Sequence, residues 1–143
     1  MSKQHIPTRL RARVRATSPR HCAYCHSPEA LLGIRMEIDH IISEAAGGVT
    51  VLSNLCLICS RCNRHKHART QAPDLITGRR VRLFHPKRQR WPEHFMWGPD
   101  GTCLIGLTPC GRATVAALNM NDAFIVPLRQ MWMDDGRHPM QNE

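Results

Sequence analysis

The stretch that decides the fold is residues 36–66, which read MEIDHIISEAAGGVTVLSNLCLICSRCNRHK. Residues 36–42 are rich in β-branched side chains and predict a strand, and the apolar run 55–58 predicts a second strand. Between them, the glycine pair at 47–48 indicates a loop. Residues 61–69 predict a helix. The order strand, loop, strand, helix follows from this stretch alone.

Two CxxC knuckles frame the two predicted strands. They are Cys22-Ala23-Tyr24-Cys25 and Cys59-Ser60-Arg61-Cys62, separated by residues 26–58. Each knuckle can put two thiolates on one tetrahedral cation, so together they predict a structural Zn²⁺ held by Cys22, Cys25, Cys59 and Cys62. The alternative is a set of small buried thiols, which is how we interpret Cys56 among its apolar neighbours. Ser60 is a suitable N-cap for the helix that follows.

The basic residues of the chain fall in two blocks. The formal net charge is +9, and residues 1–28 carry six lysines and arginines without an acid. Residues 61–90 carry ten against one acid, Asp74, whereas three acids cluster between the blocks within residues 37–44. A solvated surface would explain either block alone. Two blocks around an acidic patch predict a phosphate-binding rim around a cation site.

Length and hydropathy bound the class of protein. The chain has 143 residues, 42% of them hydrophobic, which suits one domain and is short for two cores. The longest stretch without a charge, residues 45–60, is shorter than the about 20 apolar residues of a membrane span. No apolar signal region is visible near the start, so a disulfide framework is not expected. We expect a cytoplasmic protein with no membrane partner.

His40 and its neighbours carry the chemistry that a phosphodiester partner requires. Hydrolysis needs a base for the attacking water, a cation for the growing negative charge, and a fixed in-line geometry. His40 is the candidate base, beside Asp39 and inside the segment that the zinc would clamp. Asp39 and Asn63 offer the hard oxygen ligands that suit Mg²⁺, whereas zinc prefers thiolates. A structural and a catalytic metal can therefore coexist.

Two positional features bear on this site. Neighbours on a regular strand point to opposite faces, so Asp39 and His40 can serve one site only where the strand ends or bends. His67 lies four residues after Asn63 and shares its helix face. It is interpreted either as an extra ligand, which would admit Mn²⁺ or Ni²⁺, or as a surface histidine that contacts phosphate.

Taken together, these motifs resemble the HNH endonucleases, which have a ββα-metal fold. The resemblance covers about residues 20–70 and rests on Asp39-His40-Ile41-Ile42, Gly47-Gly48, Asn54-Leu55 and the run from Cys59 to Lys66. Asn63 stands where the family has its last histidine, as in the HNN variants, which use that asparagine on the metal. The resemblance implies that His40 is the general base and that Asn54 holds the loop and orients His40. It also implies a metal that contacts the scissile phosphate and the leaving 3′ oxygen.

The flanking segments predict an α+β chain built around this core. Ile6, Leu10 and Val14 repeat at helical spacing, so residues 7–17 predict a helix that docks on the core. The order downstream resembles an extension found beside the nuclease core in small prokaryotic and phage HNH proteins. We interpret residues 1–143 as one domain, made of the N-terminal helix, the HNH core at 20–70 and the extension at 71–133. Within the extension the pattern predicts a basic segment at 78–90, a β-hairpin turning at 98–101, a helix from 108–109 and an amphipathic segment at 123–132.

The leading hypothesis is a DNA endonuclease that nicks or cuts by hydrolysis, acting as a monomer or homodimer without an organic cofactor. The alternatives are a zinc-stapled nucleic-acid-binding module without catalysis and an RNA-cleaving HNH effector. A mere binder needs no base beside a cation site, which favours the enzyme. The basic side chains expected to hold nucleic acid are Arg9, Arg13, Arg61, Arg64, Lys66 and Arg69.

Overall fold

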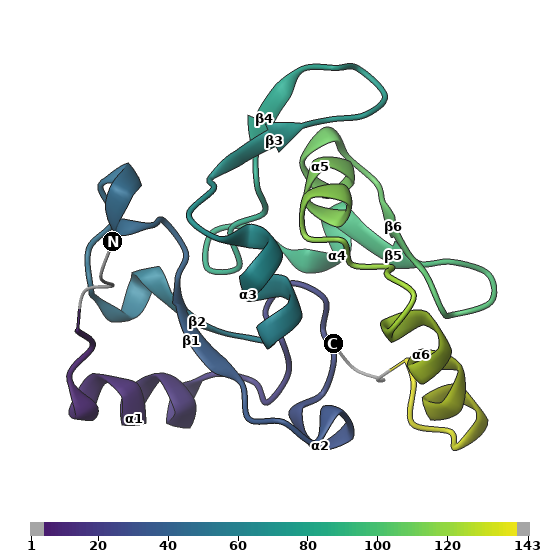
Figure 1. Ribbon diagram of the computed structural model, residues 1–143, viewed down its shortest axis with the longest axis horizontal. Helices are drawn as coiled ribbons and strands as arrows, with labels where there is room; N and C mark the ends of the chain where they lie inside the picture. The colour runs from purple at the N-terminus through teal and green to yellow at the C-terminus, as the bar shows by residue number, and fades with distance from the viewer. Residues whose placement is uncertain (1–4, 140–143) are drawn as a thin grey trace.

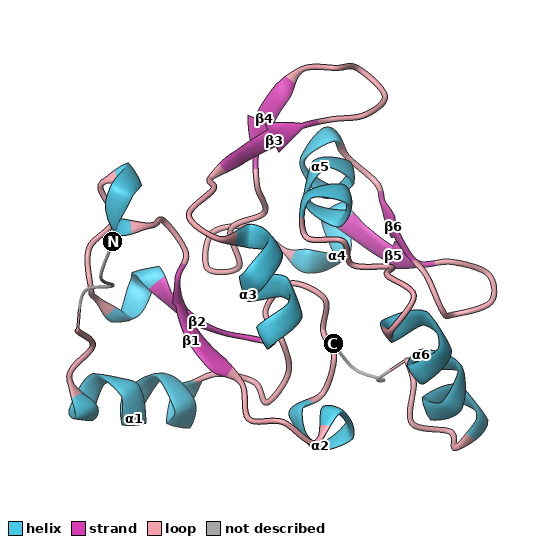
Figure 2. Cartoon of the chain, in the orientation of Figure 1, coloured by secondary structure: helices cyan, strands magenta, loops and turns pink. Residues whose placement is uncertain are grey.

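The computed structural model describes residues 5–139, which form short helices and small antiparallel sheets (Figure 2). This agrees with the predicted α+β class. None of the helices formed by these residues has the length and apolar character needed to cross a bilayer. The helices are α1 (Thr8–Thr17), α2 (Glu29–Leu32), α3 (Ser60–Lys66), α4 (Trp91–His94), α5 (Pro109–Ala117) and α6 (Ile125–Asp134), with 3₁₀ turns η1 (Glu44–Ala46) and η2 (Leu52–Asn54). The strands are β1 (Glu37–His40), β2 (Leu55–Ile58), β3 (Gln71–Pro73), β4 (Arg80–Arg82), β5 (Phe95–Trp97) and β6 (Leu104–Gly106).

The predicted order strand, loop, strand, helix is confirmed by β1, β2 and α3. β1 and β2 pair antiparallel, with Glu37 opposite Ile58 and His40 opposite Leu55. The predicted first strand is shorter than expected, because only the four residues of β1 pair with β2. α3 follows β2 directly and, in Figure 1, lies between this sheet and the C-terminal part of the chain.

The helix boundary was predicted wrongly at both ends. The N-cap is Cys59, whose Sγ accepts a hydrogen bond from the backbone N–H of Cys62 at 3.4 Å, while Ser60 is the first helical residue. A cysteine sulfur takes the acceptor role that we had assigned to the hydroxyl. The helix also stops at Lys66, before the expected residue 69, because His67 leaves the helical region with a φ of 53°.

The core confirms the N-terminal helix and its apolar stripe. In α1, Val14 is fully buried, Ile6 just before the helix is buried, and Leu10 packs against the same cluster. The stripe packs against the sheet formed by β1 and β2, and all four residues of β2 are buried. α1 contacts β2 and η2, whereas α3 contacts β1, and the candidate site residues Asp39, His40 and Asn63 lie on β1 and α3.

The predicted hairpin and helices of the extension are also present. β5 and β6 pair around the predicted turn, and the Thr108 hydroxyl caps α5 by accepting from the Gly111 N–H at 3.0 Å. Arg129 of α6 is fully buried and donates to the Thr102 and Met120 carbonyls at 2.8 and 2.7 Å. These bonds attach α6 to the loops that flank α5 and β6.

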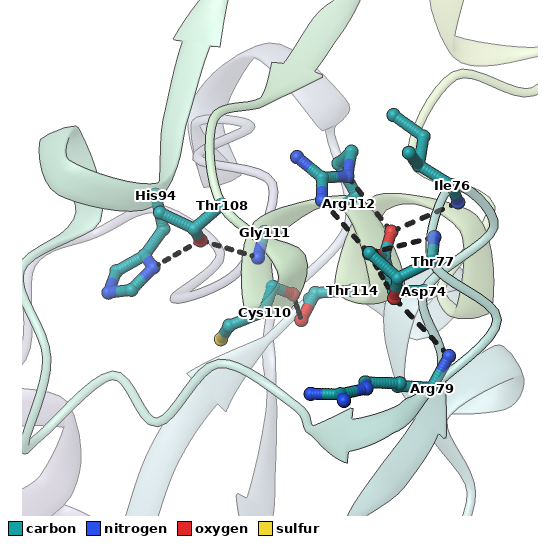
Figure 3. A network of polar contacts seen from close by, with 10 residues as sticks. All are labelled: Asp74, Ile76, Thr77, Arg79, His94, Thr108, Cys110, Gly111, Arg112 and Thr114. Carbon is teal, nitrogen blue, oxygen red and sulfur yellow. Dashed lines mark hydrogen bonds and ion pairs between the residues drawn. The ribbon is translucent and has the colours of Figure 1, made fainter.

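The hairpin formed by β3 and β4 was missed in the sequence. We had ended the predicted helix at residue 69 and assigned no strand to the residues after it, whereas β3 and β4 pair with Ala72 opposite Val81. Its turn depends on the buried carboxylate of Asp74, which accepts two hydrogen bonds from Arg112, each 2.9 Å (Figure 3). Because Arg112 lies 38 residues away in α5, no local pattern could have revealed this contact.

Asp74 should make the stability of the protein depend on pH. Its hydrogen bonds with Arg112 hold the pKa of the Asp74 carboxyl well below its usual range. A carboxyl with a depressed folded pKa stabilises the protein above its unfolded pKa of about 4, and this contribution is lost as the pH falls towards the folded pKa. Asp74→Asn should therefore lower the melting temperature by several degrees at pH 7 and flatten its decline between pH 5 and pH 3.

Calorimetry at several pH values measures both effects. The matched control is Asp135→Asn, which removes an exposed carboxylate and should leave the curve unchanged. Identical pH profiles for Asp74→Asn and the wild type would contradict the role assigned to the ion pair.

Candidate functional site

Four buried cysteines converge on one point. The sulfurs of Cys22, Cys25, Cys59 and Cys62 all lie within 4.8 Å of one another, and those of Cys25 and Cys59 are 3.8 Å apart. Four sulfurs about 2.3 Å from a central zinc ion stand about 3.8 Å apart at the corners of a tetrahedron. The four cysteines predicted from the sequence therefore form a possible zinc-binding site.

Backbone hydrogen bonds shape the first knuckle and attach it to the sheet. The Cys22 N–H donates to the Ser27 carbonyl at 3.0 Å, and the His26 N–H donates to the Cys22 carbonyl at 2.9 Å. The Ala23 N–H donates to the Leu57 carbonyl of β2 at 2.9 Å. The second knuckle begins α3, so a shared ion would join the segment before α2, the sheet and the helix.

The remaining cysteine of the central segment is not part of this cluster. Cys56 is buried in β2, and burial raises the pKa of its thiol well above the ordinary range. Its neighbours Leu55, Leu57 and Ile58 are buried with it in the hydrophobic core. This agrees with its interpretation as a core residue.

A cleft of about 500 Å³ lies beside the cysteine cluster and is lined by β1, α3 and the loop between β1 and η1. It gathers Asp39, His40, Asn63 and His67, four of the residues expected to act in catalysis or metal binding. His40 is the last residue of β1, so the strand ends where Asp39 and His40 must reach the same site. We had required such a strand end for Asp39 and His40 to face one site.

His40 is held by a partner that the sequence did not indicate. Its Nε2 lies 2.9 Å from the hydroxyl oxygen of Thr50, in the loop that connects β1 to β2. The side chain is mostly buried, with 6% of the residue exposed. The imidazole is therefore fixed in orientation at the edge of the cleft.

Asn54 closes the loop that carries this contact. Its side-chain amide donates to the carbonyls of Ile42 and Val49 at 3.0 and 2.9 Å, and its Oδ1 accepts from the Ile42 N–H at 2.9 Å. Three bonds from one buried side chain join the two ends of the loop. Gly48 packs so closely against Ile42 and Asn54 that a Cβ at this position would overlap them.

Asp39 is paired with a lysine inside the fold. Lys66 Nζ lies 2.8 Å from Asp39 Oδ2 and also donates to the His40 carbonyl at 3.1 Å. Only 1% of Lys66 is exposed, so our expectation that it binds nucleic acid is corrected. The fourth residue after Cys62 lies on the same inward face of α3, which buries it.

Arg61 requires the same correction. It is buried, its Nε donates to Asp122 Oδ2 at 3.1 Å, and its guanidinium lies over the ring of Phe124. This arginine connects α3 with the segment before α6 instead of facing solvent. The other basic residues expected to hold nucleic acid are exposed: Arg9, Arg13, Arg64 and Arg69.

Glu37 is a site residue that the sequence analysis did not single out. The Asn63 side-chain amide donates to Glu37 Oε1 at 2.6 Å, which directs the Asn63 Oδ1 away from that carboxylate. Glu37 lines the cleft and precedes Asp39 by two residues. Because strand residues two apart share a face, this spacing was the available signal.

The cleft offers oxygen ligands without a converged metal site. Glu37, Asp39 and the Asn63 amide can supply oxygens to a hard divalent cation, and His67 can supply a nitrogen. Among residues 5–139, the cysteines are the one group of three or more acidic, histidine or cysteine ligands whose donor atoms all converge within 4.8 Å. The carboxylates and His67 share the cleft at wider separations.

The first prediction from this geometry concerns the loop. Gly48→Ala should push a methyl group into the Ile42 carbonyl and the Asn54 amide, lowering the melting temperature by several degrees and accelerating exchange of the Ile42 amide proton. Hydrogen exchange followed by NMR measures this directly. Val49→Ala, which trims an exposed side chain in the same loop, should leave exchange unchanged. Normal protection of Ile42 in Gly48→Ala would contradict the packing described.

The second prediction concerns the cysteines. Purified protein should carry about one zinc ion per chain by metal analysis, and Cys22→Ser/Cys25→Ser should lose both the ion and the cooperative unfolding transition. Zinc-finger peptides gain roughly 10–16 kcal/mol from such an ion, more than the usual stability of a small domain. Cys103→Ser, outside the cluster, should retain the metal. A folded double variant with the wild-type melting temperature would refute the structural role.

Comparison with known proteins finds a family match over the part of the chain that carries these features. Residues 22–69 match the model of the HNH endonuclease family, and this segment runs from the first cysteine of the cluster to just beyond α3. No curated protein and no solved structure matches the chain. The matched residues 22–69 carry both the cysteine cluster and most of the residues that line the cleft, so this segment is similar to the HNH endonucleases.

Proposed function

We propose that this protein is a metal-dependent endonuclease that hydrolyses DNA phosphodiester bonds. The observation that carries the proposal is the cleft of the HNH segment, where the fixed imidazole of His40 meets Asp39, Asn63 and a second carboxylate, Glu37. A base beside several oxygen ligands is what hydrolysis of an anionic diester requires.

His40 is the general base in this proposal. Its ring takes a proton from the attacking water, and the contact with Thr50 keeps the ring from turning as it does so. Asn54 acts one step further away, because the loop that it closes carries Thr50. Asn54 is therefore a positioning residue, in agreement with the role implied by the family resemblance.

Asp39 and Asn63 are the proposed ligands of the catalytic cation, with His67 as an additional one. Mg²⁺ suits the oxygen donors, and His67 would also admit Mn²⁺ or Ni²⁺. A bound cation neutralises charge on the scissile phosphate and stabilises the leaving 3′ oxygen. Glu37 orients the Asn63 amide, and Lys66 fixes the Asp39 carboxylate and the His40 backbone together.

The cysteine cluster has a structural role in this proposal. A zinc ion bound by the four thiolates would fix the start of α3, which carries Asn63 and Lys66, relative to the sheet that carries Asp39 and His40. The exposed arginines Arg9, Arg13, Arg64 and Arg69 are proposed to hold DNA phosphates around the cleft.

Cleavage of supercoiled plasmid tests the proposal. Wild-type protein with Mg²⁺ should convert supercoiled DNA to nicked or linear forms, and EDTA should stop the reaction. His40→Ala should lower the rate by about 10²–10⁴-fold, the usual contribution of a general base.

The control is His5→Ala, an exposed histidine ahead of α1, which should cleave like the wild type. A parallel reaction with RNA separates a DNase from an RNA-cleaving effector. If His40→Ala and the wild type give the same trace nicking, the site is not catalytic, and retained DNA binding would then favour a zinc-stapled binding module.

A further inference from the structure

The tip of the β3–β4 hairpin presents two aliphatic side chains to solvent. Leu75 and Ile76 are 75% and 74% exposed, the highest values among the exposed large hydrophobic residues of the described chain. They lie next to each other in the turn, which projects from the rest of the fold in Figure 1. Single exposed apolar residues are common, but an adjacent pair on a projecting turn has no role in this core.

Hydrogen bonds to the Asp74 carboxylate hold the turn in one conformation. Asp74 accepts from Arg112 and from the Ile76 and Thr77 backbone, and the Thr77 hydroxyl donates to the same carboxylate at 2.8 Å (Figure 3). The Asp74 N–H also donates to the Arg79 carbonyl at 2.8 Å. The two aliphatic side chains are therefore presented on a preorganised backbone, which lowers the entropic cost of inserting them into a partner.

The hairpin is strongly basic around this apolar tip. Arg79, Arg80 and Arg82 are all exposed, and the single acid of the hairpin, Asp74, is buried and paired with Arg112. A membrane surface or an acidic protein could match an isolated patch of this kind. The surroundings of the hairpin favour a different partner.

A basic cleft connects the hairpin to the catalytic loop. The residues that line this cleft of about 430 Å³ include Arg69, Arg82 and Arg88, together with Ile42 and Ala46 of the loop. Ala46 and Arg69 directly follow residues 45 and 68, which line the candidate catalytic cleft. Exposed arginines therefore line both clefts, Arg64 at the candidate catalytic cleft and Arg69, Arg82 and Arg88 at this one, as a polyanionic partner that spans both would require.

We propose that the β3–β4 hairpin is a wedge that enters the minor groove of duplex DNA and bends it. Leu75 and Ile76 insert between adjacent base pairs, and Arg79, Arg80 and Arg82 bind the phosphates on either side. Apolar wedges of this chemistry unstack a base step and kink the duplex by roughly 20–90°. The side chains are aliphatic, which suits wedging into a duplex better than stacking on single-stranded bases, where aromatic rings are used. The inference rests on the proposed function, because it takes DNA as the substrate.

Bending can be measured without cleavage. A His40→Ala protein in buffer without added Mg²⁺ is mixed with a short duplex that carries a fluorescent donor and acceptor at its ends, and with a second duplex that contains 2-aminopurine. Binding should bring the duplex ends closer and raise the 2-aminopurine fluorescence as a base step unstacks. Adding Leu75→Ser/Ile76→Ser should abolish both signals and weaken binding about tenfold, while the melting temperature stays unchanged.

Three further variants sharpen the test. Ile34→Ser/Met131→Ser removes two other exposed apolar side chains and should bend DNA normally. Leu75→Met/Ile76→Met keeps the apolar volume and should preserve both signals. Arg80→Ala/Arg82→Ala should reduce the slope of log affinity against log salt by about 1.8, since each phosphate contact contributes about 0.9.

The outcomes separate the wedge from the nuclease. Equal bending by the Leu75→Ser/Ile76→Ser protein, or binding without any bend, overturns the wedge and leaves plasmid cleavage as evidence for the enzyme. Bending that depends on Leu75 and Ile76 in a protein that never nicks plasmid supports the wedge and overturns the nuclease. If the Leu75→Ser/Ile76→Ser protein loses the binding to anionic phospholipid vesicles that the wild type shows, but still bends the duplex, the tip is a membrane contact and the wedge is overturned.

Discussion

The convergence of four sulfurs is the constraint on which the rest of this structure depends. The segment that matches the HNH family model has two four-residue strands and a short helix, and such elements bury too little surface to hold the cleft residues in place on their own. The cysteines connect the chain before α2 with the start of α3, and the Ala23–Leu57 hydrogen bond connects the same knuckle to β2. In the cleft, Ser60 and Asn63 directly follow Cys59 and Cys62, and Asp39 and His40 are attached through the pairing of β1 with β2.

Around this cross-link, the fold satisfies buried polar groups in pairs drawn from distant parts of the sequence. Lys66 meets Asp39, Arg61 meets Asp122, and Arg112 meets Asp74. Buried charges require such partners, because an unpaired ion in the interior costs several kcal/mol. The three pairs join α3 to β1, α3 to the segment before α6, and α5 to the β3–β4 hairpin. Of these, the Arg61–Asp122 pair joins residues 22–69 to the extension.

Local signals in the sequence were sufficient for β1, β2, α1 and the β5–β6 hairpin. Each has its periodicity, its turn residues or its cap within a few positions, so neighbouring residues determine the structure. The β3–β4 hairpin could not be found in this way, since its turn is completed by Arg112 from α5. The burial of Arg61 and Lys66 could not be predicted from the sequence either, because it depends on their distant partners Asp122 and Asp39. Glu37 could have been predicted as a site residue, because it lies two residues before Asp39 on the same strand.

The Asp39–Lys66 ion pair also bears on the order in which the cleft is filled. A carboxylate that already faces an ammonium group has little net charge to offer, so a free divalent ion gains less from it than from an unpaired aspartate. A nucleic acid backbone brings negative charge of its own into the same space. If the cleft binds a cation and a nucleic acid as proposed, each would strengthen the binding of the other by an equal factor, as thermodynamic linkage demands, and the cation alone would be held only loosely.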